Sequence, residues 1–223
     1  MSLRKKIWLT LALLLYSFST GGLAESQSPL KTLDTGQFIT KKWKVIDGFR
    51  SAKFGMSEKQ VMRAIAKDFK VPKNKIERLV TPLHKTTALI IHLPKLVQIG
   101  GPADIVYILG YKSKRLVQVN IDWGSGVSDN FKPAEIFIVR KFLRTHFMKK
   151  RYKKEGYVLN AREADTPTDT RTLVFRGRDQ KDRMVLLRME SAKLKEGQPK
   201  KGTRGLKLIL TYIQNVDNPD FFK

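Results

Sequence analysis

The segment from Arg115 to Trp123 alternates between apolar and polar side chains, and this alternation constrains the fold more than any other feature of the chain. A period of two predicts a β-strand with one face against a core and the other in contact with water. Such half-covered strands are typical of antiparallel sheets. The alternating residues are Val117, Val119, Ile121 and Trp123 on the apolar side, and Gln118, Asn120 and Asp122 on the polar side.

Two segments place apolar residues at helical spacing and predict amphipathic helices. The first covers residues 58–69, where Ser57 and Gln60 form a capping box and Pro72 ends the helix. The second begins at Pro133 and is expected to end in a cationic run closed by a glycine C-cap at Gly156. Its predicted buried stripe contains Ile136, Val139, Leu143 and Phe147, widened by Phe137 and Phe142.

The same order of elements occurs twice along the chain. A helix followed by three strands is predicted in residues 43–124 and again in residues 125–216, after a flexible lead-in over 25–42 and before a tail over 217–223. The pattern predicts an α+β fold of tandem helix–β-β-β halves, with one or two antiparallel sheets and the helices packed on one face. The predicted strands cover residues 86–93, 104–109 and 115–123, then 172–176, 183–190 and 206–214.

The N-terminus has the composition of a cleavable export signal. Three basic residues at positions 4–6 precede an apolar run over residues 7–18, and the small residues Gly22 and Ala24 suit a signal peptidase. The run is shorter than the roughly 20 residues that a membrane-spanning helix needs. We therefore expect residues 1–24 to be removed and the mature protein to be periplasmic or secreted. An uncleaved N-terminal anchor is the alternative.

The chain is strongly basic, with a formal net charge of +24 that falls to +21 without residues 1–24. Such an excess raises the local concentration of anionic partners. Export favours anionic lipid phosphates, envelope polymers or acidic proteins over nucleic acid as those partners. The alternative is a solvated basic surface that only keeps the protein soluble. The chain has no cysteine, which excludes disulfides, thiol nucleophiles and thiolate metal sites.

Three groups of basic residues are the candidate binding sites. If they converge in space, they would form a site for phosphate or carboxylate groups, with the arginines as bidentate donors. If they do not, they are separate solvated patches. The groups are Lys112, Lys114 and Arg115; Lys149, Lys150, Arg151, Lys153 and Lys154; and Lys200, Lys201 and Arg204.

No catalytic constellation, cofactor motif or metal site is predicted. The histidines His84, His92 and His146 lack the close spacing of a metal-binding pair, and none is next to a carboxylate cluster. Ser125 lies between two glycines, which does not match the nucleophile elbow of hydrolases. A non-catalytic binding or envelope-assembly protein is therefore the leading hypothesis, and an exported hydrolase with an unrecognised site is the alternative.

The residues FGMSEKQV at positions 54–61 resemble the "G-M-S/T-x-x-x-V" opening of small bacterial envelope proteins of the SmpA/OmlA type. Those proteins share a scaffold of a helix followed by β-hairpins with the β-lactamase-inhibitor-protein-like fold. The resemblance implies a periplasmic scaffold that binds other proteins or assists envelope assembly. This chain departs from the lipoprotein members, because it has no cysteine to acylate at the mature N-terminus.

Overall fold

One antiparallel sheet organises the described part of the chain. The computed structural model describes residues 41–163, 169–192 and 205–222, which belong to a single structural unit. Within these ranges the sheet has eight strands in the order β3-β4-β5-β6-β10-β9-β8-β7. The strands are β3 (Glu77–Val80), β4 (Thr87–Leu93), β5 (Ala103–Leu109), β6 (Leu116–Gly124), β7 (Val158–Arg162), β8 (Asp169–Arg178), β9 (Met184–Ala192) and β10 (Lys207–Ile213).

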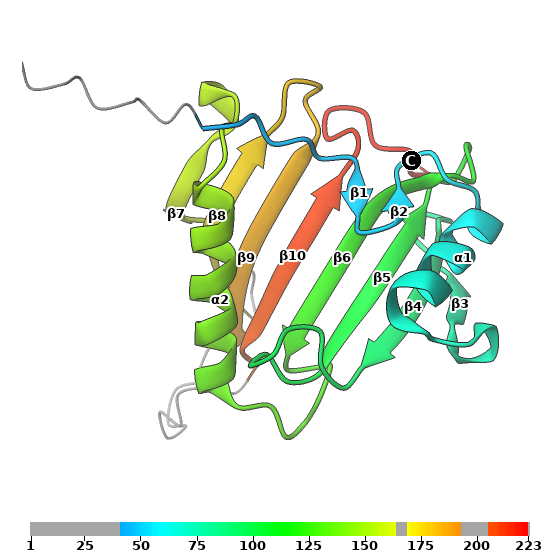
Figure 1. Ribbon diagram of the computed structural model, residues 1–223, viewed down its shortest axis with the longest axis horizontal. Helices are drawn as coiled ribbons and strands as arrows, with labels where there is room; N and C mark the ends of the chain where they lie inside the picture. The colour runs from blue at the N-terminus through cyan, green and yellow to red at the C-terminus, as the bar shows by residue number, and fades with distance from the viewer. Residues whose placement is uncertain (1–40, 164–168, 193–204, 223) are drawn as a thin grey trace, which may run out of the picture. The chain divides into compact units, whose positions relative to one another are not determined.

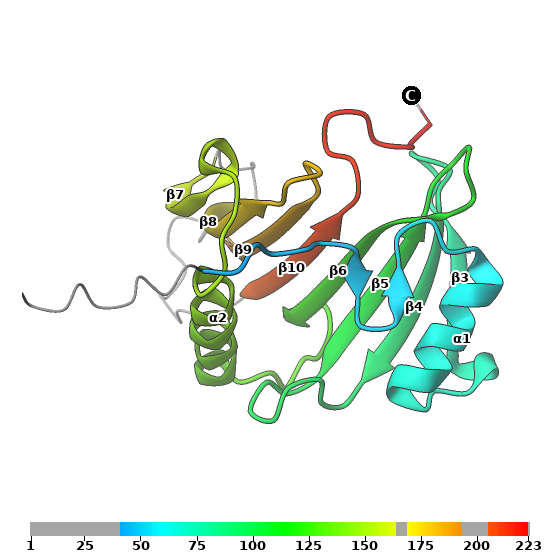
Figure 2. The ribbon, with the colours of Figure 1, turned by 45° about the horizontal axis from the view of Figure 1, so that its top comes forward.

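Two α-helices and a small hairpin lie on one face of this sheet (Figure 1). The helices are α1 (Glu58–Phe69) and α2 (Pro133–Met148), and the hairpin pairs β1 (Gly48–Phe49) with β2 (Ala52–Lys53). The backbone N–H of Ser57 donates to Gln60 Oε1 at 2.8 Å, as the capping box requires. Figure 2 shows the two helices beside opposite halves of the sheet, α1 near β3–β5 and α2 near β8–β10.

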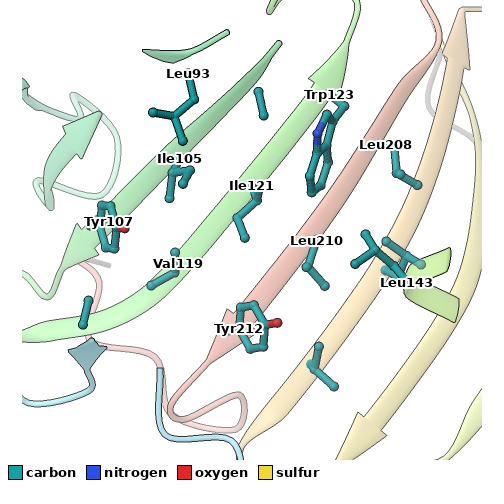
Figure 3. Packing of buried hydrophobic residues seen from close by; sticks show 14 of the residues in the cluster. Leu93, Ile105, Tyr107, Val119, Ile121, Trp123, Leu143, Leu208, Leu210 and Tyr212 are labelled. Atoms are coloured by element: carbon teal, nitrogen blue, oxygen red, sulfur yellow. The ribbon is translucent and has the colours of Figure 1, made fainter. Parts of the chain in front are cut away.

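The core lies between the helices and the covered face of the sheet. The buried residues of α1 and α2 belong to one hydrophobic cluster with the strand residues that face them. Val119, Ile121 and Trp123 are buried in this cluster, as the alternation predicts, and Figure 3 shows them beside Leu210 and other core side chains. Their polar neighbours on the opposite face are half-buried. The prediction is wrong for Val117, which is half-buried, because the pairing with β5 shifts register at this end and Leu116 is buried instead. The predicted α+β class with an antiparallel sheet is confirmed.

Two strands of the eight-stranded sheet have no counterpart among the predicted ones, and neither do the two short strands of the β1–β2 hairpin. β3 and β7 are the two edge strands, and each pairs with one neighbour only. All four residues of β3 are exposed, so the strand has no buried face that would impose an alternating pattern. Edge strands of this kind leave little hydrophobic signal in a sequence.

Two predictions for the second helix are wrong. The helix ends at Met148, and Gly156 instead closes a short 3₁₀ helix (Lys154–Gly156), where it is buried against Arg178. Phe137 and Phe142 do not widen the buried stripe, because their side chains are 45% and 57% exposed. Contact with the sheet fixes the rotation of α2, and only one side of its apolar surface is covered.

Within the described ranges, neither helix combines the length and apolar character needed to cross a bilayer. The predicted export signal over residues 1–24 lies outside the described residues, as does most of the predicted lead-in.

Candidate anion-binding surface

The packing of α2 on the sheet fixes the position of the cationic run that follows the helix. Ile136, Val139, Leu143 and Phe147 are buried as predicted, so the C-terminal end of α2 has a fixed position on the sheet. Lys149 follows as the C-cap residue in an α-helical backbone conformation. Cations are favourable at this end of a helix, because the last carbonyl groups carry partial negative charge.

A second basic segment lies alongside this run, although the two are about a hundred positions apart in the sequence. The backbone N–H of Arg151 donates to the Lys42 carbonyl at 3.1 Å, and the N–H of Lys44 donates to the Arg151 carbonyl at 3.0 Å. Lys41 Nζ donates to the Met148 carbonyl at 3.2 Å. We call the resulting group the α2-end cluster; its members are Lys41, Lys42, Lys44, Lys149, Lys150 and Arg151.

The pKa values of two titratable groups, Lys44 and His146, are lowered at this cluster. Burial lowers the pKa of Lys44, and the charge of Lys150 lowers it further. Burial also lowers the pKa of His146, and Lys44, Lys150 and Lys149 add to that effect. The Arg151 guanidinium lies 4.3 Å from the centre of the Trp43 ring, a cation–π contact that orients it.

The six cations of the α2-end cluster have no carboxylate within salt-bridge distance among the described residues. The next cation along the chain differs, since Lys153 Nζ lies 2.7 Å from the Asp182 carboxylate. The predicted group 149–154 is therefore divided: its first three members join the cluster, whereas Lys153 is paired within the protein.

The predicted group at positions 112–115 lies in the turn between β5 and β6, and a carboxylate of the same chain already occupies this turn. The backbone N–H groups of Lys112 and Ser113 donate to Asp220 at 2.8 and 2.9 Å. Partial burial alone would raise the pKa of Asp220, but the hydrogen bonds from Ser113 and Lys112 outweigh it and lower that pKa. Lys114 Nζ lies 5.1 Å from the Tyr111 ring.

The predicted groups do not converge among the described residues. Figures 1 and 2 both place the β5–β6 turn and the C-terminal end of α2 toward opposite sides of the sheet. Lys200, Lys201 and Arg204 lie outside the described residues. The structure instead brings together residues 149–151 and residues 41–44, and the latter were not predicted as a site. The basic sequence KKWK at positions 41–44 was the available signal, but its first two residues were assigned to the flexible lead-in.

The face of the sheet that carries no α-helix holds a row of charged residues of a different kind. His92 pairs across the strands with Asp104, and Asp104 pairs with Asp122. His92 Nδ1 lies 2.7 Å from Asp104 Oδ1, and Nε2 lies 3.2 Å from Glu77 Oε1. No carboxylate adjoins His92 in the sequence, because both of its carboxylate partners come from the strands on either side of β4.

Asp122 is the most perturbed carboxyl group of this row. Burial raises its pKa to about 6, and the nearby charge of Asp104 contributes to the rise. Its Oδ1 atom is buried without a hydrogen-bond partner among the described residues. The described parts of the chain contain no group of three or more histidine and carboxylate side chains arranged to hold a metal ion.

No family model, curated protein sequence or solved structure matched this chain. The resemblance to envelope proteins of the SmpA/OmlA type therefore stays a prediction, and the geometry above is the basis for the function proposed below.

Proposed function

We propose that this protein is an exported, non-catalytic binding or envelope-assembly protein that uses a basic surface to bind an anionic partner. The observation that carries the proposal is the α2-end cluster, where two basic segments distant in sequence are hydrogen-bonded side by side. Six cations without carboxylate partners in the described residues create a positive potential that an anionic group would neutralise. Phosphate and carboxylate groups both suit this mixture of lysine and arginine.

The rigidity of the cluster supports a binding role. Backbone hydrogen bonds hold residues 42 and 44 against Arg151, and the packed α2 helix holds Lys149 and Lys150. A surface that is ordered before binding loses less conformational freedom when a partner arrives. Anionic lipid phosphates, envelope polymers and acidic proteins are the candidate partners, with nucleic acid less favoured for an exported protein.

We also infer that residues 43–124 and 125–216 are tandem halves of one scaffold. Each contains an α-helix followed by four strands, and strands β6 and β10 pair at the centre of the sheet. This arrangement would suit the envelope-protein scaffold that residues 54–61 resemble, with the departure at the missing N-terminal cysteine noted above.

Two charge-matched variants test the binding proposal. One replaces Lys149, Lys150 and Arg151 by glutamine, and the other replaces Lys112, Lys114 and Arg115 by glutamine, so both lose the same three charges. Inorganic polyphosphate serves as the anionic probe, with affinity measured at several salt concentrations. A surface cation near an array of anionic groups contributes about 1 kcal/mol, so the first variant should lose at least about tenfold in affinity and the second much less.

The result also distinguishes a defined surface from a diffuse charge effect. Equal losses in the two variants would show that only net charge matters and would overturn the assignment of the α2-end cluster. The absence of polyphosphate binding by the unmodified protein would overturn the proposed function itself. Binding should weaken as salt rises, because added ions screen the interaction and reduce the gain from counterion release.

Export is tested separately by the intact mass of the protein produced from its own Met1. The proposal expects a product that begins at Glu25 and is recovered outside the inner membrane. A cytosolic product that retains residues 1–24 would contradict it.

A further inference from the structure

The side of α2 that faces away from the sheet carries large apolar side chains among lysines. Ile138, Lys141, Phe142, Thr145 and Lys149 follow one another at intervals of three, four or one residues and line one shallow surface depression together with His146. We call these five residues the outer α2 stripe. Ile138 is 47% exposed and Phe142 is 57% exposed. Adjacent Phe137 extends the apolar surface.

Charge along the helix identifies the kind of partner. Glu135 is the only acidic residue of α2, and it lies in the first turn, 3.8 Å from Lys132 Nζ. Lys141 and Lys149 line the same depression as Ile138 and Phe142. The α2-end cluster continues the positive surface beyond Met148. A partner must therefore offer both negative charge and an apolar layer directly beneath it.

An anionic phospholipid bilayer offers this combination. A helix that lies in the plane of the bilayer inserts phenylalanine and isoleucine side chains below the headgroups, while lysines extend to the lipid phosphates. The sixteen residues of α2 present one side to the sheet and the opposite side outward, which is the geometry such docking needs. An acidic protein would satisfy the lysines, but it has no general reason to present an apolar layer behind its charges.

We propose that the outer α2 stripe docks on the surface of a bilayer containing anionic phospholipid. Ile138 and Phe142 insert at the level of the headgroups and the first acyl carbons, and Lys141 and Lys149 contact lipid phosphates. The proposal rests on the proposed function, because it assigns a lipid surface as the anionic partner and uses the α2-end cluster as the continuation of the docking surface.

Vesicle co-sedimentation tests the docking surface. The probes are vesicles of phosphatidylglycerol mixed with phosphatidylcholine, and vesicles of phosphatidylcholine alone. The test variant carries Ile138→Ser and Phe142→Ser. The matched control carries Leu83→Ser and Ile99→Ser, which replace side chains that are 75% and 57% exposed but lie outside α2. Urea unfolding midpoints should stay close to that of the unmodified protein for both variants, because all four side chains are exposed.

The unmodified protein should bind the phosphatidylglycerol vesicles and not the pure phosphatidylcholine vesicles. The Ile138/Phe142 variant should bind them at least about tenfold more weakly, because it loses the inserted apolar area, and the control should stay within about twofold. Vesicle binding that is equal in the two variants would overturn the docking surface.

Polyphosphate binding separates this inference from the proposed function. Both serine variants retain every cation, so their affinity for polyphosphate should equal that of the unmodified protein. Polyphosphate binding without vesicle binding would refute the lipid assignment and leave the proposed function in place. If the unmodified protein bound neither polyphosphate nor vesicles, the proposed function and the lipid assignment would both be refuted.

Discussion

Replacing Asp122 by asparagine should stabilise this protein at neutral pH. Asp122 lies on the sheet face that carries no α-helix, and its Oδ1 atom is buried without a hydrogen-bond partner among the described residues. Burial, together with the charge of the paired Asp104, raises its pKa from 3.8 to about 6. Asparagine has nearly the same shape and no charge, so the variant removes the cost of ionisation and leaves the packing almost unchanged.

The magnitude follows from the size of the pKa change. The folded state binds the proton more tightly than the unfolded state, so stability is greatest below pH 3.8 and is lost as the pH rises through about 6. A rise of about two pH units, at about 1.4 kcal/mol for each unit, gives an upper limit of about 3 kcal/mol. Because Asp122 is only partly buried and water screens its charge, we expect a gain of about 1–2 kcal/mol for Asp122→Asn at pH 7.5.

Urea unfolding of both proteins between pH 4 and pH 8 measures this difference. The stability gain of the variant should be largest at pH 7.5 and should become small at pH 4, where Asp122 is protonated in the folded state and about half protonated in the unfolded state. Asp129→Asn serves as the control, because Asp129 is exposed in a loop and its replacement should change stability by less than about 0.5 kcal/mol. An Asp122→Asn variant with no gain at pH 7.5, or with a gain independent of pH, would refute the reasoning.

Two further substitutions test neighbouring features of the sheet. The hydrogen bond to Asp104 raises the pKa of His92, with a further contribution from Glu77. The stabilisation from His92 is therefore complete below pH 6.5 and is lost as the pH rises through its folded pKa. Because His92 is exposed, His92→Gln should lower the free energy of unfolding by at most about 1 kcal/mol at pH 5.5 and by less at pH 8. Urea unfolding at the two pH values measures this, and equal losses would contradict the ion-pair assignment. Gly177→Ala would place a Cβ atom 2.5 Å from the Tyr152 ring. Thermal unfolding should therefore show a loss of about 1–3 kcal/mol in the free energy of unfolding, and unchanged stability would contradict this clash.

The elements with strong local signals were predictable from the sequence. The capping box at Ser57 and the stop at Pro72 give the observed bounds of α1. The alternation over 115–123 gives the position of β6 and its covered face from Val119 to Trp123. β3 and β7 could not be found in this way, because an edge strand with little burial on either side has no periodic pattern to detect. Their presence depends on pairing with β4 and β8, which is a property of the assembled sheet.

The rotation of α2 illustrates a second limit. Apolar residues surround much of this helix, so periodicity alone does not decide which of them face the sheet. Phe137 and Phe142 adjoin the buried stripe in sequence, yet the sheet covers the opposite flank and leaves both exposed. The candidate site depends on a similar long-range contact, since only folding brings Lys42 and Lys44 beside Arg151.

Lipid binding by the outer α2 stripe and the stability of the fold can be changed independently, because the residues that govern them lie on different faces of the sheet. The row of His92, Asp104 and Asp122 lies on the sheet face opposite to the one on which α2 packs. A change in the ionisation of Asp122 therefore alters folding energy without altering the outer α2 stripe. Conversely, the stripe can lose Ile138 and Phe142 without removing a core contact, because the buried side of α2 holds the helix on the sheet. Any change in lipid binding in that variant would then report the docking surface itself, since the unfolded fraction stays the same.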